Sequence, residues 1–90
     1  MTGWTIRYDR AVVKGLAKLD RPTRDRIQDY MDDVARLDDP RSRGKALTAN
    51  LVGLWRYRVG DYRIVCDIED GELVVLVIDV AHRSRVYKRA

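Results

Sequence analysis

The first forty residues combine one alternating segment with two segments of helical periodicity. Residues 4–8 alternate apolar and polar side chains, which predicts a short β-strand. Two helices joined as a hairpin are predicted next, because apolar residues recur every three or four positions on both sides of a short break. We expect Asp9 to cap the first helix, Pro22 to lie in the first turn of the second, and Pro40 to end it. The apolar positions are Val12, Val13, Leu16 and Leu19 in the first helix and Ile27, Tyr30, Met31 and Val34 in the second.

A β-hairpin is predicted in the second half of the chain, where the period of the apolar pattern changes to two. Residues 41–53 are predicted to form a loop, and residues 54–59 and 62–68 then alternate as two strands. Gly60-Asp61 between them fits a two-residue turn of type II′, which requires a positive φ at its first position.

A final strand is predicted from the nearly continuous apolar run over residues 73–80, which is typical of a central strand covered on both faces. Asp70-Gly71 before it predicts a second tight turn, of type I′ character. The order of elements is β-α-α-β-β-β. We therefore expect a single α+β domain over residues 1–90, in which a helical hairpin packs on a small, twisted, antiparallel-rich sheet.

Length and composition exclude several classes of protein. The chain has 90 residues, of which 46% are hydrophobic, which suits one small folded domain and argues against disorder. No apolar run approaches the ~20 residues that span a bilayer, and the N-terminus lacks the apolar core of a signal peptide. We therefore expect a cytoplasmic protein with no membrane partner. One cysteine, Cys66, and one histidine, His82, exclude an internal disulfide and a Cys/His zinc site, and we expect no metal or other cofactor.

The positive charge is concentrated in the second half of the chain. Residues 1–40 carry eight basic and eight acidic side chains, so the formal net charge of +4 comes entirely from residues 41–90. A basic surface indicates an anionic partner, of which nucleic acid is the commonest large example. A net charge of this size also serves solubility, so its location is more informative than its magnitude.

Three arginines are predicted to share one face of the hairpin. The two-residue turn places Arg58 opposite Arg63, with Cβ atoms about 5 Å apart, and the period of two brings Arg56 onto the same face. Like charges directly opposite each other are destabilising, and no carboxylate of the hairpin lies next to this row, because Asp61 is in the turn and Asp67 lies two residue pairs further away than Arg56. A shared phosphate would offset the repulsion, because the guanidinium fork binds phosphate oxygens in a bidentate manner. The alternative is an exposed face that carries arginines for solubility.

The basic C-terminal tail adds candidate chemistry near the end of the last strand. His82 is the one side chain whose unperturbed pKa, ~6.5, allows ready proton exchange at neutral pH. Arg83 and Arg85 add positive charge, and Tyr87 could stack on a base or orient a phosphate. A single histidine is more often a surface or core residue, however, and a tyrosine near a terminus often packs against its own domain.

One stretch resembles the hallmark of the RelE/ParE superfamily of bacterial toxins from type II toxin–antitoxin operons: residues 51–65, with the sequence LVGLWRYRVGDYRIV. The segments Val80-Ala81-His82-Arg83 and Val86-Tyr87 are similar to the C-terminal part of the same family. The likeness covers nearly the whole chain and implies the RelE-like fold. It also implies an acidic antitoxin protein as partner, in a hetero-oligomer.

RelE-like members of this family are ribosome-dependent endoribonucleases, and this is the branch that we favour. The resemblance implies a toxin that enters the ribosomal A site, cuts mRNA and so inhibits translation. The 2′-hydroxyl of the substrate attacks the adjacent phosphate without a metal, which leaves a 2′,3′-cyclic phosphate and a 5′-hydroxyl. By position, the resemblance implies a catalytic set of Arg56, Arg58, Arg63, His82, Arg83 and Tyr87. We also expect Lys45, Arg85 and Lys88 to bind RNA.

One departure from the family changes the expected roles. The positions of Arg56 and Arg58 hold lysine in RelE-type members, and arginine cannot act as a base because its pKa is above ~12. We therefore expect both arginines to stabilise the transition state electrostatically, with Arg63 on the phosphate and Arg83 on the developing charge. The base is then His82, a group of the ribosome, or water.

Two other functions fit the same resemblance. ParE-like members share the fold, lack a full catalytic set and inhibit DNA gyrase. The chain could also be a non-toxic module that binds RNA or a protein partner. Only the endoribonuclease cuts mRNA during translation, and only the gyrase-directed toxin arrests growth with DNA damage signalling and intact mRNA.

Overall fold

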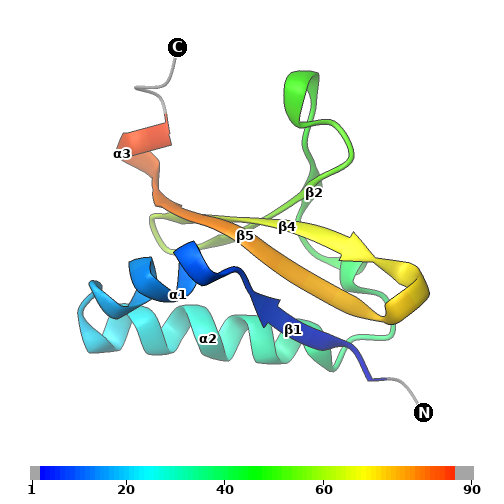
Figure 1. The fold of residues 1–90 in the computed structure, drawn as a ribbon, viewed down its shortest axis with the longest axis horizontal. Helices are drawn as coiled ribbons and strands as arrows, with labels where there is room; N and C mark the ends of the chain where they lie inside the picture. Colours follow the sequence, from blue (N-terminus) through cyan, green and yellow to red (C-terminus); the bar gives the residue numbers. More distant parts are fainter. Residues whose placement is uncertain (1–2, 87–90) are drawn as a thin grey trace.

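A five-stranded mixed sheet forms the centre of the molecule, and α1 and α2 lie on one of its faces (Figure 1). The computed structural model describes residues 3–86. The strand order is β1-β5-β4-β3-β2, with β1 parallel to β5 and the other neighbours antiparallel. The expected α+β class is therefore confirmed. The elements are β1 (Thr5–Tyr8), α1 (Arg10–Ala17), α2 (Arg21–Ala35), η1 (Pro40–Ser42), β2 (Lys45–Ala46), η2 (Ala49–Leu51), β3 (Trp55–Val59), β4 (Tyr62–Glu69), η3 (Asp70–Glu72), β5 (Val74–His82) and α3 (Arg83–Val86), where η denotes a 3₁₀ helix.

The hydrophobic core lies between the two long helices and the sheet face that they cover. Burial of each large aliphatic side chain there contributes about 1.5–3 kcal/mol relative to exposure. Val13 does not join the core, because its side chain is 53% exposed, so that part of the predicted apolar stripe was wrong. One residue advances a helix by about 100°, so Val13 points away from the buried Val12 beside it. The core residues include Val12, Leu16, Ile27, Met31, Val34, Tyr57, Ile64, Cys66, Val75 and Val77.

Hydrogen bonds to neighbouring segments help to set the ends of the helices. Asp20 caps α2, because its carboxylate accepts the backbone N–H three residues later at 3.3 Å, whereas Asp9 precedes α1 without a side-chain capping bond. The prediction that Pro40 ends α2 was wrong. The helix ends at Ala35, whose carbonyl oxygen accepts the backbone N–H of Trp4 at 3.3 Å, and Pro40 begins η1 instead. Within residues 3–86, no helix has the length and apolar character to cross a membrane.

The predicted loop over residues 41–53 contains a strand that the sequence did not reveal. β2 has two residues and pairs with β3 in antiparallel register, with Lys45 opposite Arg56. Two residues are too few for a period of two to be recognised. The segment is also tied to β3 by the indole N–H of Trp55, which donates to the carbonyl oxygen of Arg43 at 2.7 Å. The loop is therefore held against the sheet close to the arginines of β3.

The connection between β4 and β5 is not the predicted type I′ turn. Asp70-Gly71 belongs to η3, and Leu73 follows with a φ of +55°, in the left-handed region. Arg41 binds the Asp70 carboxylate through two hydrogen bonds of 2.9 Å. This contact holds the pKa of the Asp70 carboxyl below its usual value. The longer turn therefore brings Asp70 into contact with Arg41, which is 29 residues away in sequence. Turn preferences depend on neighbouring residues only and could not predict this contact.

β5 is a central strand, as expected, and lies between β1 and β4, but within the described part of the chain helices cover only one of its faces. Val75 and Val77 are fully buried against the helices. On the other face Val74 is buried, Leu76 is half-buried, and Asp79 further along is exposed. The prediction of cover on both faces was therefore wrong, and an uncovered face is available for a partner.

A β-bulge shifts the pairing of β5 with β4. Cys66 pairs with Val77 and the preceding Val65 pairs with Asp79, so Ile78 has no partner in the register. Because successive strand side chains alternate between faces, one extra residue reverses the faces of all that follow. The bulge therefore decides which residues at the end of β5 lie on the uncovered face.

The buried thiol of Cys66 predicts a loss of stability at alkaline pH. Burial raises its pKa from the usual value of 9.0 to about 12. The unfolded chain therefore releases this proton first, and we expect the free energy of unfolding to fall as the pH rises from about 9 toward 12. Urea unfolding of wild type and Cys66→Ala at a series of pH values measures this. The variant should show a shallower fall, and equal slopes would contradict the assignment.

Candidate active site

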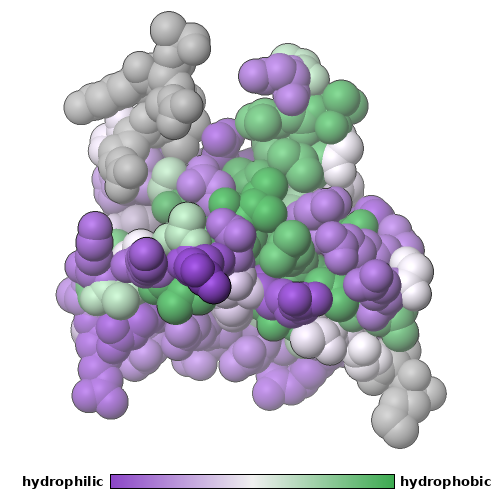
Figure 2. All heavy atoms as spheres, in the orientation of Figure 1, coloured by the Kyte–Doolittle hydropathy of each residue, from purple (hydrophilic) through white to green (hydrophobic). Residues whose placement is uncertain are grey.

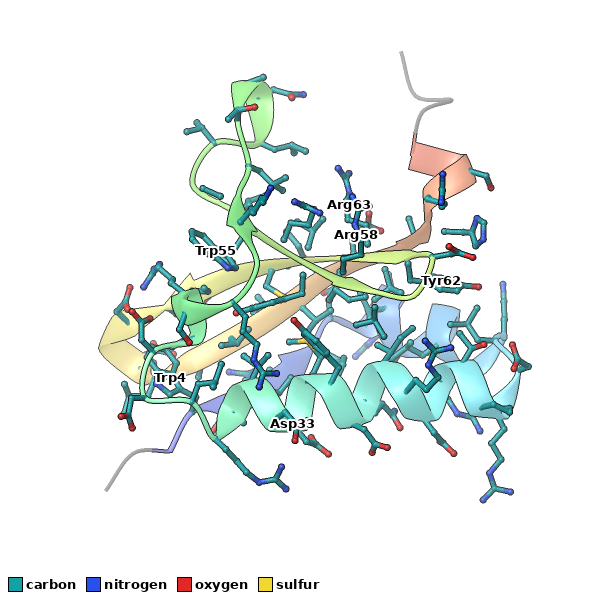
Figure 3. The ribbon with its side chains drawn as sticks, turned by 180° about the vertical axis from the view of Figure 1, so that it is seen from behind. Trp4, Asp33, Trp55, Arg58, Tyr62 and Arg63 are labelled. Atoms are coloured by element: carbon teal, nitrogen blue, oxygen red, sulfur yellow. The ribbon has the colours of Figure 1, made fainter. Side chains whose placement is uncertain are left out.

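The β3–β4 hairpin brings the three predicted arginines onto one face of the sheet. Arg58 pairs directly with Arg63, as the two-residue turn predicted, and Gly60 in that turn has a φ of +56°. The neighbouring Tyr57 is buried on the helix side, so Arg56 and Arg58 face the other way. Figure 3 shows Arg58 and Arg63 projecting from the face opposite α2. The prediction that Arg56, Arg58 and Arg63 share one face of the hairpin is therefore confirmed.

A fourth cation joins this row. Lys45 of β2 lies opposite Arg56 in the register, so both side chains share the uncovered face. The Nε atom of Arg63 is buried and has no hydrogen-bond partner among the described residues. A buried polar atom without a partner costs about 1–3 kcal/mol. The ion pairs recorded within residues 3–86 involve none of these four cations, so the cluster is suited to an external anion.

Asp79 is a carboxylate on the same face that the hairpin alone did not predict. It pairs with Val65, which shares its face with Arg63. Sequence reasoning considered only the carboxylates of the hairpin itself, and the β-bulge brings this one over from the next strand. The available signal was the interruption of the apolar run by a single aspartate at residue 79.

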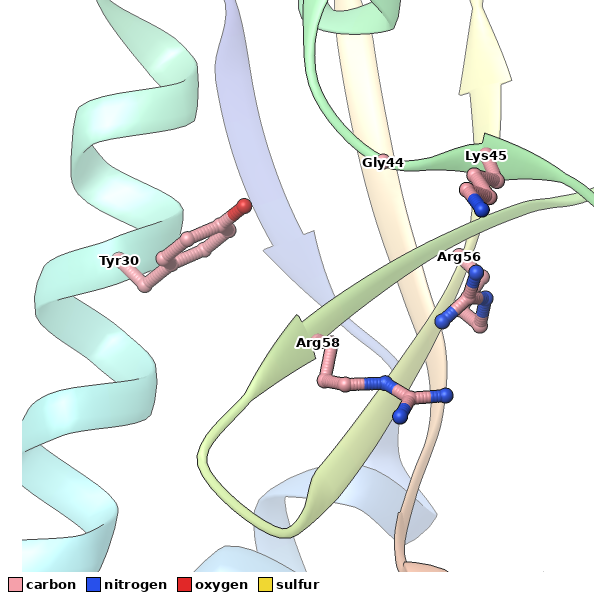
Figure 4. A pocket seen from close by; sticks show the side chains of 5 residues that line it. All are labelled: Tyr30, Gly44, Lys45, Arg56 and Arg58. Atoms are coloured by element: carbon pink, nitrogen blue, oxygen red, sulfur yellow. The ribbon is translucent and has the colours of Figure 1, made fainter.

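A pocket of about 440 Å³ opens beside the row, between α2 and the β2–β3 edge. Figure 4 shows Tyr30 on the α2 side and the three cationic side chains on the strand side. Sequence reasoning assigned Tyr30 to the core, yet it is half-buried and lines the pocket, and nothing in the pattern singled out Gly44. The lining residues are Tyr30, Gly44, Lys45, Arg56 and Arg58.

His82 lies on the opposite face of the sheet from the arginine row. It pairs with Tyr62, which alternates with Arg63 and packs against the core, and the two rings meet edge to face with centroids 5.2 Å apart. The Nδ1 atom of His82 accepts the backbone N–H of Ser84 at 3.2 Å and lies 2.9 Å from its hydroxyl oxygen. The structure therefore does not bring His82 together with the arginines.

Arg83 is held at the turn of the hairpin. Its backbone N–H donates to the carbonyl oxygen of Asp61 at 2.8 Å, and its Nη1 lies 3.8 Å from the Asp61 carboxylate. This places Arg83 near the end of the row, beyond the Arg58–Arg63 pair. The remaining predicted residues, Tyr87 and Lys88, and the side chain of Arg85 lie outside the part of the chain that the structure describes.

Two projections rise on the side of the sheet that carries the arginines. Figure 1 shows the segment between β2 and β3 on one side and α3 on the other, with β3 and β4 between them. Figure 2 shows apolar side chains gathered on the β2–β3 segment, where Val52 is 76% exposed. The arginine row therefore lies between the apolar β2–β3 segment and α3, with Arg83 at the start of α3, an arrangement suited to an extended anionic chain.

Known proteins are similar to this chain in both sequence and fold. The family described as ParE toxin of the type II toxin–antitoxin system parDE matches residues 6–87. Toxin RelE of Mycobacterium tuberculosis is 44% identical over 52 residues, 58% of this chain and 54% of that protein. Toxin RelG of the same organism is 29% identical over 87 residues, 96% of this chain and 98% of that protein.

Solved toxin–antitoxin complexes extend the likeness to the fold. A chain of the RelBE2 complex from M. tuberculosis superimposes with a TM-score of 0.82 and 28% identity, over 93% of this chain and 95% of that one. The RelE–RelB complex of Pyrococcus horikoshii gives 0.72 and 26% identity, over 94% and 99%. These findings confirm the expected resemblance to the RelE/ParE superfamily and indicate a toxin of RelBE type. Because the family match spans nearly all of the sequence, the chain belongs to the ParE toxin family of type II toxin–antitoxin systems.

Proposed function

We propose that this toxin is a ribosome-dependent endoribonuclease that cuts mRNA and so inhibits translation. The observation that carries the proposal is the buried, unpartnered Nε of Arg63 within a row of four cations. Guanidinium groups in such a row fit the oxygens of one RNA phosphate, whose charge removes the repulsion between them. The small domain needs little further machinery if the ribosome positions the message and the RNA supplies its own nucleophile.

The chemistry follows from what arginine can and cannot do. The 2′-oxygen of the message forms a bond to the adjacent phosphorus, the bond from phosphorus to the 5′-oxygen breaks, and a 2′,3′-cyclic phosphate and a 5′-hydroxyl result. Arg56, Arg58 and Arg63 would stabilise the extra negative charge of the transition state, and one such donor contributes about 3–4 kcal/mol. None of them accepts the proton of the 2′-hydroxyl, because arginine remains charged at any physiological pH.

The proton acceptor is best assigned to the ribosome or to water. His82, the alternative, faces the helix side of the sheet and directs its Nδ1 toward Ser84. We therefore expect His82→Gln to keep cleavage rates within about threefold of wild type across pH 6–8, since removal of a true general base costs about 10²–10⁴-fold. Cleavage by purified toxin on programmed ribosomes measures this. A loss above tenfold with an altered pH profile would return the role to His82.

The partner proposed for this toxin is an acidic antitoxin protein that binds it in a hetero-oligomer. RelE toxins of the solved complexes are bound to RelB antitoxins. The uncovered sheet face of this chain, with four cations beside apolar side chains, suits an acidic partner with an apolar stripe. Binding there would cover the arginine row and so keep the toxin inactive.

Primer extension on mRNA after induction of the toxin tests the activity. Cuts that keep phase with codons and that require translating ribosomes would support the endoribonuclease. A gyrase-directed toxin is the second candidate, because the matching family bears the ParE description. Growth arrest with intact mRNA and a DNA-damage response would favour that function instead.

A further inference from the structure

The pocket beside the arginine row has two chemically different walls, and only one of them is used by the proposed cleavage. The strand wall carries Lys45, Arg56 and Arg58, and the helix wall carries Tyr30. Gly44, directly before Lys45, also lines the pocket. Its volume of about 440 Å³ lies within the range of small-ligand sites.

The ring of Tyr30 is held from two directions. The guanidinium of Arg43 lies over it, 5.6 Å from the ring centroid, and Tyr57 meets it edge to face at 5.9 Å. Cation–π and aromatic contacts of this kind orient a ring without using its hydroxyl group. Figure 4 shows the Tyr30 hydroxyl directed from α2 toward the strand side of the pocket. The structure records no hydrogen bond of this hydroxyl within residues 3–86.

The chemistry of the two walls matches the two ends of a nucleotide. A phosphate carries negative charge for Lys45 and Arg58, whereas a ribose or a base edge carries donors and acceptors for a tyrosine hydroxyl. Because Arg56 and Arg58 belong both to the pocket and to the row, a chain with a phosphate on the row can place a neighbouring nucleotide in the pocket.

We propose that this pocket binds one nucleotide of single-stranded RNA next to the phosphate that is cut. Lys45 and Arg58 contact its phosphate, and the Tyr30 hydroxyl hydrogen-bonds to its ribose or base. Tyr30 is then a substrate-binding residue of the toxin. This inference rests on the proposed function for the identity of its ligand, and the two can be tested separately.

The test is the binding of a fluorescent RNA hexanucleotide to the purified toxin, measured at several salt concentrations. We expect Lys45→Gln to weaken binding and to lower the slope of log affinity against log salt by about 0.7, the value for one phosphate contact on a single strand. Tyr30→Phe should weaken binding about threefold to tenfold with an unchanged slope, because it removes one uncharged hydrogen bond. Lys14→Gln, an equal charge change on the exposed side of α1, should bind like wild type.

Each outcome separates the pocket from the cleavage activity. Wild-type affinity and slope in both pocket variants, or no measurable binding by the wild type, would overturn the nucleotide pocket. Codon-phased cleavage alongside such a result would leave the proposed function standing. Conversely, binding that depends on Tyr30 and Lys45, without any translation-dependent cleavage, would support the pocket and reject the nuclease. If an acidic peptide binds with the same dependence and RNA does not, the pocket belongs to a protein partner and the inference fails.

Discussion

Arg63→Ala is expected to lower translation-dependent mRNA cleavage by about 10²–10³-fold, the cost of removing one donor to transition-state charge. Arg63 lies opposite Arg58, and its buried Nε has no partner within the described chain. The loss of this side chain therefore removes a positioned donor to the phosphate and does not break an internal ion pair. Single-turnover cleavage on programmed ribosomes gives the rate, and thermal unfolding reports stability.

The matched control for this prediction is Arg10→Ala, which removes the same side chain from an exposed position on α1. It should cleave like wild type. Binding of the antitoxin by Arg63→Ala should remain largely intact, because many contacts of a large interface carry little energy each. A cleavage rate within threefold of wild type in Arg63→Ala would contradict the phosphate-binding role.

Gly44→Ala is expected to lower the free energy of unfolding by about 3 kcal/mol, from backbone strain together with overpacking. Gly44 has a φ of +78°, which side chains rarely adopt. A Cβ atom there would also overlap the carbonyl oxygen of Arg56 and lie 2.7 Å from the indole nitrogen of Trp55. The substitution should therefore push β2 off β3, and Lys45 out of the pocket. Urea unfolding and RNA-hexanucleotide binding measure the two effects.

Substitutions at two other glycines distinguish backbone strain from overpacking as the cause of the lost stability. Gly53 has a φ of +97° but open space around it, so Gly53→Ala should cost only about 1 kcal/mol of backbone strain. Gly15 lies within α1 with nothing within 4 Å, and Gly15→Ala should stabilise the protein by about 0.5–1 kcal/mol. If Gly44→Ala costs no more than Gly53→Ala, the close approach of the chain to β3 is not important for stability.

Local rules predicted the part of the site that local geometry determines. The two-residue turn at Gly60 fixes the pairing of Arg58 with Arg63, so the arginine row could be predicted from the sequence alone. β2 could not, because two residues carry no period, and its position depends on the indole of Trp55. The turn at Asp70 was also mispredicted, because its conformation is accompanied by a contact from a distant part of the chain: Arg41 donates two hydrogen bonds to the Asp70 carboxylate.

The position of His82 and Asp79 shows a different limit. Both depend on a bulge whose extra residue is apolar, like most of the strand around it, so the sequence gives no sign of where the alternation changes. The pocket adds a third limit, because Tyr30 joins the strand residues only through the packing of α2 on the sheet. Residues of one hairpin could thus be assembled from the sequence, and residues of separate elements could not.

The bulge at Ile78 also restricts how this surface can change over evolutionary time. A point substitution alters one side chain but leaves every other residue of β5 on its present face. Loss of the bulge with Ile78 retained would restore strict alternation and turn His82 toward the arginines and Asp79 toward the helices in one step, whereas deletion of Ile78 would leave both on their present faces. The end of the strand therefore contains two alternative surfaces in one sequence, and a relative of the same strand length without the bulge would turn its residue 82 toward the face on which this toxin presents Asp79.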